Sequence, residues 1–154
     1  MRVTVVAVGR LKEPHWRAAA DEYAKRLRPY ATLDVVEVPD RDISRDLAVA
    51  RSAEAGDILR ALPAGAHVVA LDEAGRERSS PELAAWLDDL AVRGVSHVAF
   101  VVGGSAGLDA RVRAAARERL SLSRMTFPHQ LARVLLLEQL YRAFRISRGE
   151  PYHL

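Results

Sequence analysis

Three glycines within six residues are the plainest candidates for ligand binding in this sequence. Gly103, Gly104 and Gly107 form the stretch GGSAGL, between a predicted strand over 97–102 and a helix that Asp109 can cap. Without side chains they let a ligand touch the backbone, and N–H groups at a helix start attract electron-rich groups. The spacing matches neither the dinucleotide-binding nor the P-loop fingerprint. Taken alone, such glycines are more often simple turn residues than a ligand loop.

A second candidate is the segment 121–129, SLSRMTFPH. It combines hydroxyl groups, apolar side chains and one arginine, Arg124, in a stretch too short to fold as a separate unit. Backbone donors and acceptors beside an apolar wall are what a flat heterocycle requires. The same residues also fit an edge strand followed by a helix cap, and spacing does not decide between the two.

The predicted last helix, 129–145, is apolar around most of its circumference. Glu138, Arg142 and Arg145 share one narrow stripe of it, and Arg133 falls almost opposite. A helix this apolar should be buried on two sides, one against a sheet and the other against a second subunit. The alternative is a central helix buried in a monomer, for which 154 residues leave limited room.

Positive charge is concentrated in the last third of the chain. From residue 111 onward there are nine arginines and three acidic residues, a net charge of +6, whereas residues 1–110 carry −3. Arginine suits bidentate contact with phosphate better than lysine does. An acidic partner, with nucleic acid the leading candidate, is one hypothesis, and a solvated arginine-rich face is an equally good one.

The histidines and cysteines predict no metal site. None of the five histidines, His15, His67, His97, His129 and His153, has a neighbour at metal-ligand spacing, and the chain has no cysteine. Two of these histidines lie in predicted strands and are interpreted as structural. The absence of cysteine also excludes disulfides and fits a reducing compartment.

Strands and helices alternate throughout the chain, which predicts the frame that holds these segments. An α/β fold follows, with one mostly parallel sheet and helices on both faces. Ser44, Ser80 and Asp109 are the predicted helix caps. Ligands collect beyond the carboxyl ends of parallel strands, so the segments 71–79, 103–108 and 121–129 should meet there. The predicted strands are 2–8, 33–38, 66–71 and 97–102, and the predicted helices are 14–28, 45–62, 81–93, 110–120 and 129–145.

Length and composition indicate one globular domain over residues 1–154. The chain is 49% hydrophobic and 28% charged, enough to bury a core. No apolar run approaches the roughly 20 residues that span a bilayer, and the apolar N-terminus lacks a cleavage site and is interpreted as a strand. We expect a cytoplasmic protein with no membrane partner.

Four longer stretches together make the sequence recognisable: VTVVAVGRLKE, FVVGGSAGL, SLSRMTFPHQLARVLLLEQLYRAF and RGEPYHL. With these it closely resembles the RlmH family of SPOUT-class methyltransferases over essentially its whole length. That family methylates N3 of a pseudouridine in 23S ribosomal RNA. The resemblance implies a SPOUT-type α/β domain with a C-terminal trefoil knot, a rare exception to unknotted chains. It also implies a homodimer whose site lies near the subunit interface.

The resemblance further implies that S-adenosylmethionine is the methyl donor, bound in the knot, with no metal. Matching positions fall on the three strand-end segments described above. The residues that would surround the donor are Leu71, Gly103, Leu122, Ser123, Arg124, Met125, Thr126 and Phe127.

Pseudouridine N3 carries a proton, so methylation there requires a general base or a stabilised anion. His153 is the first candidate base and His129 the second, because imidazole titrates near neutrality. Equally, the two histidines fit a frayed tail and a helix start. The residues predicted to contact RNA are Arg124, Arg133, Arg142, Arg145 and Tyr152.

The small size and modest net charge predict weak affinity for free RNA and recognition of the assembled ribosome. Three other functions fit the sequence. The chain could be a nucleotide-binding domain without catalysis, a non-enzymatic ribosome-associated protein, or a SPOUT methyltransferase acting on another nucleotide.

Overall fold

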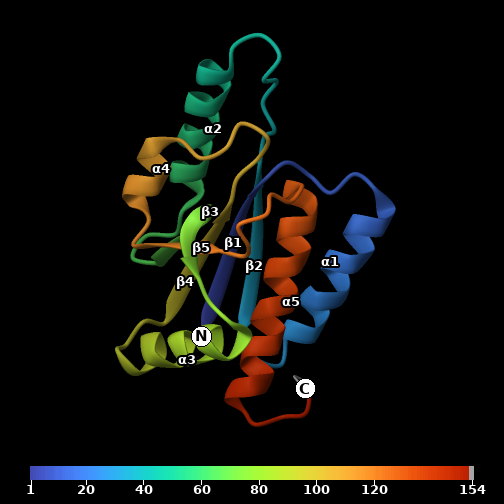
Figure 1. Ribbon diagram of the computed structural model, residues 1–154, viewed down its shortest axis with the longest axis vertical. Helices are drawn as coiled ribbons and strands as arrows, with labels where there is room; N and C mark the ends of the chain where they lie inside the picture. The colour runs from blue at the N-terminus through green and yellow to red at the C-terminus, as the bar shows by residue number, and fades with distance from the viewer. Residues whose placement is uncertain (153–154) are drawn as a thin grey trace.

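The structure, a computed structural model, describes residues 1–152, in which five strands alternate with five helices (Figure 1). All five strands belong to one sheet. In chain order the elements are β1 (Arg2–Val8), α1 (Pro14–Leu27), β2 (Thr32–Val38), α2 (Leu47–Ala61), β3 (His67–Glu77), α3 (Ser80–Val92), β4 (His97–Val102), α4 (Ala110–Ala115), β5 (Glu118–Ser121) and α5 (His129–Ser147).

The sheet has the order β2-β1-β4-β3-β5, and every neighbouring pair is parallel. β1 and β4 occupy the middle, where the sheet is covered on both faces. Both are almost continuous runs of β-branched and other apolar residues, which is typical of such central parallel strands. The predicted α/β fold with a parallel sheet is therefore confirmed.

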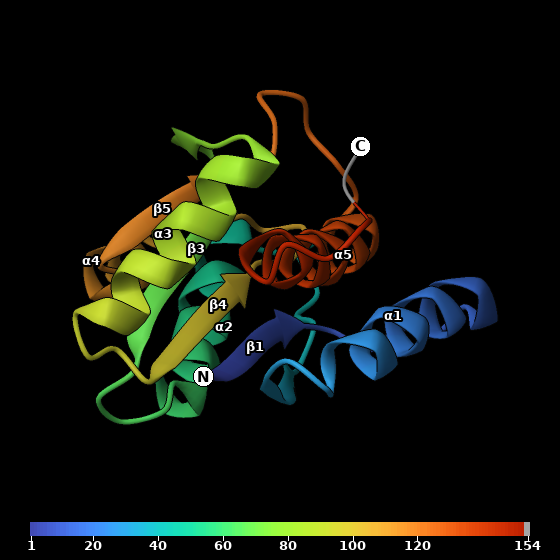
Figure 2. The same cartoon turned by 90° about the horizontal axis from the view of Figure 1, so that it is seen from below.

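Helices cover both faces of this sheet, as predicted. One apolar core lies between the sheet and α1, α3 and α5, and a second lies between the other face and α2 and α4. Figure 2 shows α5 between α3 and α1 on the first face. Val5 and Phe100 point into the first core, and their neighbours Val6 and Val101 point into the second. The trefoil knot stays a prediction.

Several helix boundaries differ from the sequence prediction, and at the starts of α2 and α3 the difference comes from the side chain that forms the cap. α2 is capped by Asp46, whose carboxylate accepts from the backbone N–H of Ala48 and Val49, whereas Ser44 lies in a turn closed by Asp42. α3 is capped one residue earlier than predicted, by Ser79 in a capping box with Glu82. α4 ends at Ala115 instead of 120.

The largest difference concerns the edge of the sheet. β5 occupies residues that were predicted to end a helix, and β3 continues to Glu77, beyond the predicted end at 71. The two strands pair from Val69 with Glu118 to Glu77 with Ser121, with an irregularity between Leu71 and Arg76. The pairing supplies backbone hydrogen bonds that the polar sequence of either segment does not signal by itself.

No helix within residues 1–152 is long and apolar enough to cross a membrane.

Candidate functional site: a cavity at the carboxyl ends of the strands

A cavity of about 400 Å³ lies beyond the carboxyl ends of β4 and β5, beside the middle of β3, where its pairing with β4 has ended. Its walls come from three segments: the residues of β3 from Leu71 to Glu73, the glycine loop after Val102, and the segment from Leu122 to His129. These are the three segments that the parallel topology was expected to bring together. The residues that line the cavity are Leu71, Asp72, Glu73, Val102, Gly103, Gly104, Ser105, Gly107, Leu108, Arg113, Leu120, Leu122, Ser123, Met125, Thr126, Phe127, Pro128, His129 and Ala132.

Seven of the eight residues predicted to surround a methyl donor line this cavity. The exception is Arg124, whose side chain is 89% exposed and lies 3.7 Å from the Glu77 carboxylate. Of the two candidate bases, His129 lines the cavity as the first residue of α5. His153 lies outside the described residues.

The glycine loop needs glycine for reasons of space and backbone conformation. A Cβ on Gly104 would lie 2.7 Å from Cγ1 of Val8, and one on Gly103 would lie 2.9 Å from Cδ2 of Leu108. Gly107 has a φ of +75° and donates its N–H to the Gly104 carbonyl at 3.1 Å. The loop therefore exposes backbone to the cavity and packs closely against the sheet below it.

Hydroxyl groups hold the opposite wall, the segment from Ser121 to Phe127. Ser121 Oγ donates to the Ser123 carbonyl at 3.0 Å, and Ser123 Oγ accepts from the Met125 N–H at 3.0 Å. Thr126 Oγ1 donates to the Glu73 carboxylate at 2.8 Å. The last bond connects this segment to β3, so two of the three walls are joined directly.

Charged residues of the cavity were not among the predicted site residues. Asp72 and Glu73 follow Leu71 directly, and their position beyond a strand end was a signal that could have found them. The Asp72 carboxylate is 3.3 Å from the Arg113 guanidinium and 3.4 Å from that of Arg119. Arg113 comes from α4, whose sequence offered no such signal.

A buried carboxylate lies beneath the glycine loop. Glu54 of α2 is 2% exposed; its Oε1 accepts from the Gly104 N–H at 3.4 Å, and its Oε2 has no hydrogen-bond partner. Desolvation raises the pKa of this carboxyl above its ordinary value, and the charges of Asp40 and Asp57 raise it further. The Gly104 hydrogen bond acts in the opposite direction, so the glycine loop rests on a carboxyl group whose pKa is raised mainly by burial.

One predicted RNA contact is placed elsewhere by the fold. The Arg133 side chain is 4% exposed and donates to the Glu37 carboxylate at 2.6 Å and to the Gly9 carbonyl at 2.7 Å. It points into the protein and joins α5 to the ends of β1 and β2. This placement disagrees with a direct contact between Arg133 and RNA.

Arg142, Arg145 and Tyr152 form what we call the C-terminal cluster, which folds the tail onto α5. Glu138 accepts from Arg142 at 2.5 Å and from the Tyr152 hydroxyl at 3.1 Å. Arg145 pairs with Glu150 and donates to the Pro151 carbonyl at 2.9 Å. Burial, and then the charge of Glu138, raise the pKa of Tyr152. These residues do not line the cavity.

The chemistry of the lining fits a ligand with a flat ring and a positive charge. Apolar side chains of Leu71, Leu122 and Phe127 share the space with the backbone of Gly103, and carboxylates stand at Asp72 and Glu73. The volume is within the range of small-molecule sites, about 300–1,000 Å³. Residues 1–152 contain no group of three or more histidine, aspartate or glutamate side chains placed to hold a metal ion.

Known proteins resemble this chain over nearly all of its length. The family model described as "Predicted SPOUT methyltransferase" matches residues 1–153. The chain is 47% identical to a Clostridium acetobutylicum protein and 49% identical to one from Symbiobacterium thermophilum, over 99% of each chain. Both relatives are named Ribosomal RNA large subunit methyltransferase H.

A solved structure shares the fold. It is described as the structure of a probable methylase family protein from Haemophilus influenzae Rd KW20, and it superposes with a TM-score of 0.57 at 16% identity. The match covers 99% of this chain and 70% of the other. With a family model and similar relatives spanning nearly all of its length, the chain belongs to the SPOUT methyltransferase family.

Proposed function

We propose that this protein is an S-adenosylmethionine-dependent methyltransferase that methylates N3 of a pseudouridine in 23S ribosomal RNA. The observation that carries the proposal is the cavity at the carboxyl end of the sheet. Three separate segments of the chain line it, and they include seven of the eight residues expected around the methyl donor. The names of the full-length relatives support ribosomal RNA as the substrate.

The chain's own residues supply binding and alignment. Leu71, Leu122 and Phe127 offer apolar surface for the adenine ring, and the backbone at Gly103 offers polar groups without an intervening side chain. Asp72 and Glu73 provide negative charge for the ammonium and sulfonium groups. S-adenosylmethionine supplies a methyl group already activated by its sulfonium, so the task of the protein is to orient the acceptor and exclude water.

A group that accepts the N3 proton completes the reaction. His129 stands in the cavity wall at the start of α5, and His153 follows Tyr152 of the C-terminal cluster. We place His153 first because a tail residue can approach an acceptor base from outside a donor site. Arg124, Arg142, Arg145 and Tyr152 remain the proposed RNA contacts, and Arg133 is withdrawn from them.

We further propose that the working form is a cytoplasmic homodimer acting on the assembled ribosome. α5 packs against α1 and α3 on one face of the sheet (Figure 2). The half-buried stretches of α5 beyond these contacts support a second subunit there. A domain of this size offers little surface for a free RNA, which favours recognition of the shape of a ribosome.

The test is mass spectrometry of 23S ribosomal RNA from a strain that lacks the gene, with a complemented strain as control. We expect one pseudouridine to lose its methyl group and to regain it on complementation. Loss of a methyl group from a different nucleotide would favour the alternative SPOUT specificity. Ribosomal RNA unchanged by the deletion would contradict the proposed function.

A calorimetric titration separates a methyltransferase from a nucleotide-binding domain without catalysis. S-adenosylmethionine should bind with about one equivalent per protomer, and ATP should bind more weakly because it has no positively charged group for the carboxylates of Asp72 and Glu73 that line the cavity. Preferential binding of ATP would contradict the proposed donor.

A further inference from the structure

We propose that the exposed edge of the sheet at β5 is a docking surface for the phosphate backbone of RNA, separate from the C-terminal cluster. Its members, which we call the arginine edge, are Arg76, Arg113, Arg117 and Arg119. The inference rests on the proposed function, because it extends that function's RNA substrate from the cavity to a further surface.

The arginine edge begins at the mouth of the cavity. Arg113 lines the cavity and shares the Asp72 carboxylate with Arg119 of β5, at 3.3 and 3.4 Å. The backbone of Arg119 in turn lies against Gly75, where a Cβ would be 2.7 Å from the Arg119 carbonyl carbon. Gly75 directly precedes Arg76. The four side chains therefore follow one another along the side of the sheet.

From β5 the arginine edge continues into a groove of about 660 Å³ beside α3. Arg76 and Arg117 line this groove together with Arg78, Arg93 and Trp86. The Arg78 guanidinium lies 5.0 Å from the centre of the Trp86 ring, and Glu118 pairs with Arg78 and accepts from Trp86. Trp86, Arg78 and Glu118 thus form an ordered set of contacts in the groove that the exposed residues Arg76 and Arg117 also line.

The arginine edge carries excess positive charge. Asp72 is a single carboxylate shared by two guanidinium groups, and Arg76 and Arg117 have no ion-pair partner among residues 1–152. Within the arginine edge itself, four guanidinium groups therefore have one ion-paired carboxylate among them, and the groove beyond also contains Glu82, Glu118 and Asp89, of which Asp89 is paired with Arg93. Exposed arginines at such a density match the phosphates of a nucleic-acid backbone, which arginine contacts in a bidentate manner.

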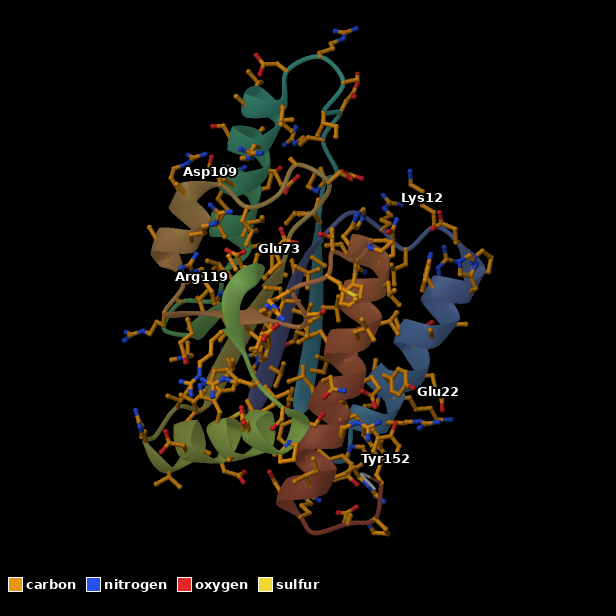
Figure 3. All side chains as sticks on the ribbon, in the orientation of Figure 1. Lys12, Glu22, Glu73, Asp109, Arg119 and Tyr152 are labelled. Atoms are coloured by element: carbon orange, nitrogen blue, oxygen red, sulfur yellow. The ribbon has the colours of Figure 1, made fainter. Side chains whose placement is uncertain are left out.

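Charged side chains on an edge strand also prevent strands of two molecules from pairing, which is the competing explanation. Two features favour RNA. The arginines extend beyond β5 to α4 and β3, and they reach the cavity in which the acceptor base would react. Figure 3 shows Arg119 and Tyr152 well apart, so the arginine edge and the C-terminal cluster are separate surfaces.

The experiment compares Arg76→Gln/Arg117→Gln with the wild type and with Arg28→Gln/Arg45→Gln. The control pair removes two exposed arginines outside the arginine edge and the groove. Each variant is titrated with ribosomes from a strain lacking the gene at several salt concentrations, and S-adenosylmethionine binding is measured alongside. We expect the Arg76/Arg117 variant to bind ribosomes at least tenfold more weakly, with the slope of log K against log salt shallower by roughly 1.5.

Donor affinity should be unchanged in both variants, and the control pair should bind ribosomes like the wild type. Equal ribosome affinity and salt dependence in the wild type and the Arg76/Arg117 variant would overturn the inference while leaving the proposed function intact. Self-association of that variant without a change in ribosome binding would also overturn the inference, because it would show that the arginines instead prevent strands of two molecules from pairing. Failure of the wild type to bind the donor or methylate ribosomes would instead count against the proposed function.

Discussion

Gly103 and Gly104 are adjacent, yet the space around them differs. A Cβ on Gly104 meets the branched, fully buried side chain of Val8, whereas one on Gly103 meets the flexible end of Leu108. Val8 has little freedom to turn away because β-branched side chains are stiff at χ1. A side chain at Gly104 should therefore disturb the packing against β1, whereas a side chain at Gly103 should disturb the packing of the loop less.

We predict that Gly104→Ala lowers the free energy of unfolding by about 1–3 kcal/mol, the usual cost of overpacking. Gly103→Ala should cost clearly less because Leu108 can move. Urea denaturation of both variants and the wild type measures the difference. Equal losses in the two variants would show that the Val8 contact does not limit the loop.

Glu54 makes stability depend on pH. Because the pKa of its carboxyl is raised in the folded state, the native protein holds a proton that the unfolded chain releases. The free energy of unfolding should therefore decrease as pH rises from the ordinary glutamate range, about 4.5, to the raised value, and then level off.

Glu54→Gln keeps an acceptor for the Gly104 N–H and removes the ionisation. The variant should become more thermostable than the wild type as pH rises from 4 to 8, with little difference at the acidic end. Exposed Glu13→Gln is the control and should show no such trend. A melting-temperature difference for Glu54→Gln that stays constant across this range would contradict a raised pKa.

Much of the cavity could be predicted from the sequence because parallel strands end at one edge of a sheet. Gly103 and Leu122 directly follow β4 and β5, Leu71 lies in β3 where its pairing with β4 has ended, and the parallel topology brings the three together. Arg113 and Arg133 could not be placed in this way. Their positions depend on how α4 ends and on which side of α5 faces β1, and neither is a local property of the sequence.

At the scale of elements, β5 shows where local pattern fails. Its residues Glu118–Ser121 include Arg119 and Glu118, which are poor signals for a strand, and they form one because β3 offers an edge to pair with. The same pairing extends β3 through the polar residues after Leu71. The ends of β3 and β5 cannot be predicted from either segment alone, because each strand is extended by its pairing with the other.

The Arg133 side chain connects α5 to the Gly9 carbonyl after β1 and to Glu37 of β2, so its removal should destabilise the packing of α5. Arg133→Ala leaves the Gly9 carbonyl and the Glu37 carboxylate without their partner, and we predict a loss of about 2–3 kcal/mol in the free energy of unfolding. The value is at the low end for a buried pair because Glu37 is 38% exposed.

The matched control is Arg93→Ala, an exposed i,i+4 pair with Asp89 on α3, which should cost less than about 0.5 kcal/mol. Chemical denaturation measures both. If Arg133→Ala were as stable as Arg93→Ala, the buried pair would not hold α5 in place.

The tail after α5 is fixed by the C-terminal cluster up to Tyr152, and the proposed base follows it. His153→Ala should reduce the methylation rate more than it reduces affinity for S-adenosylmethionine, because the donor cavity is built from other segments. Single-turnover methylation of ribosomes, with calorimetry of the donor, separates the two effects. Unchanged single-turnover methylation would eliminate His153 as the base and leave His129.

At the scale of the whole molecule, one sheet positions both the proposed donor site and the proposed RNA-docking surface. The cavity lies at its carboxyl end, and the β5 side of the sheet carries the arginine edge. The first core places α1, α3 and α5 on one face, and α3 contacts β5 there through Leu120 in the core and the bond from Trp86 to Glu118. Donor binding and RNA docking can thus occupy different surfaces that meet at Arg113.

The most direct measurement is a crystal structure of the protein with S-adenosylmethionine. The account predicts that the donor occupies the strand-end cavity, in contact with the backbone at Gly103 on one wall and with the segment from Leu122 to Phe127 on the other. A donor bound elsewhere, with Gly103 and Met125 lining an unfilled space, would contradict it.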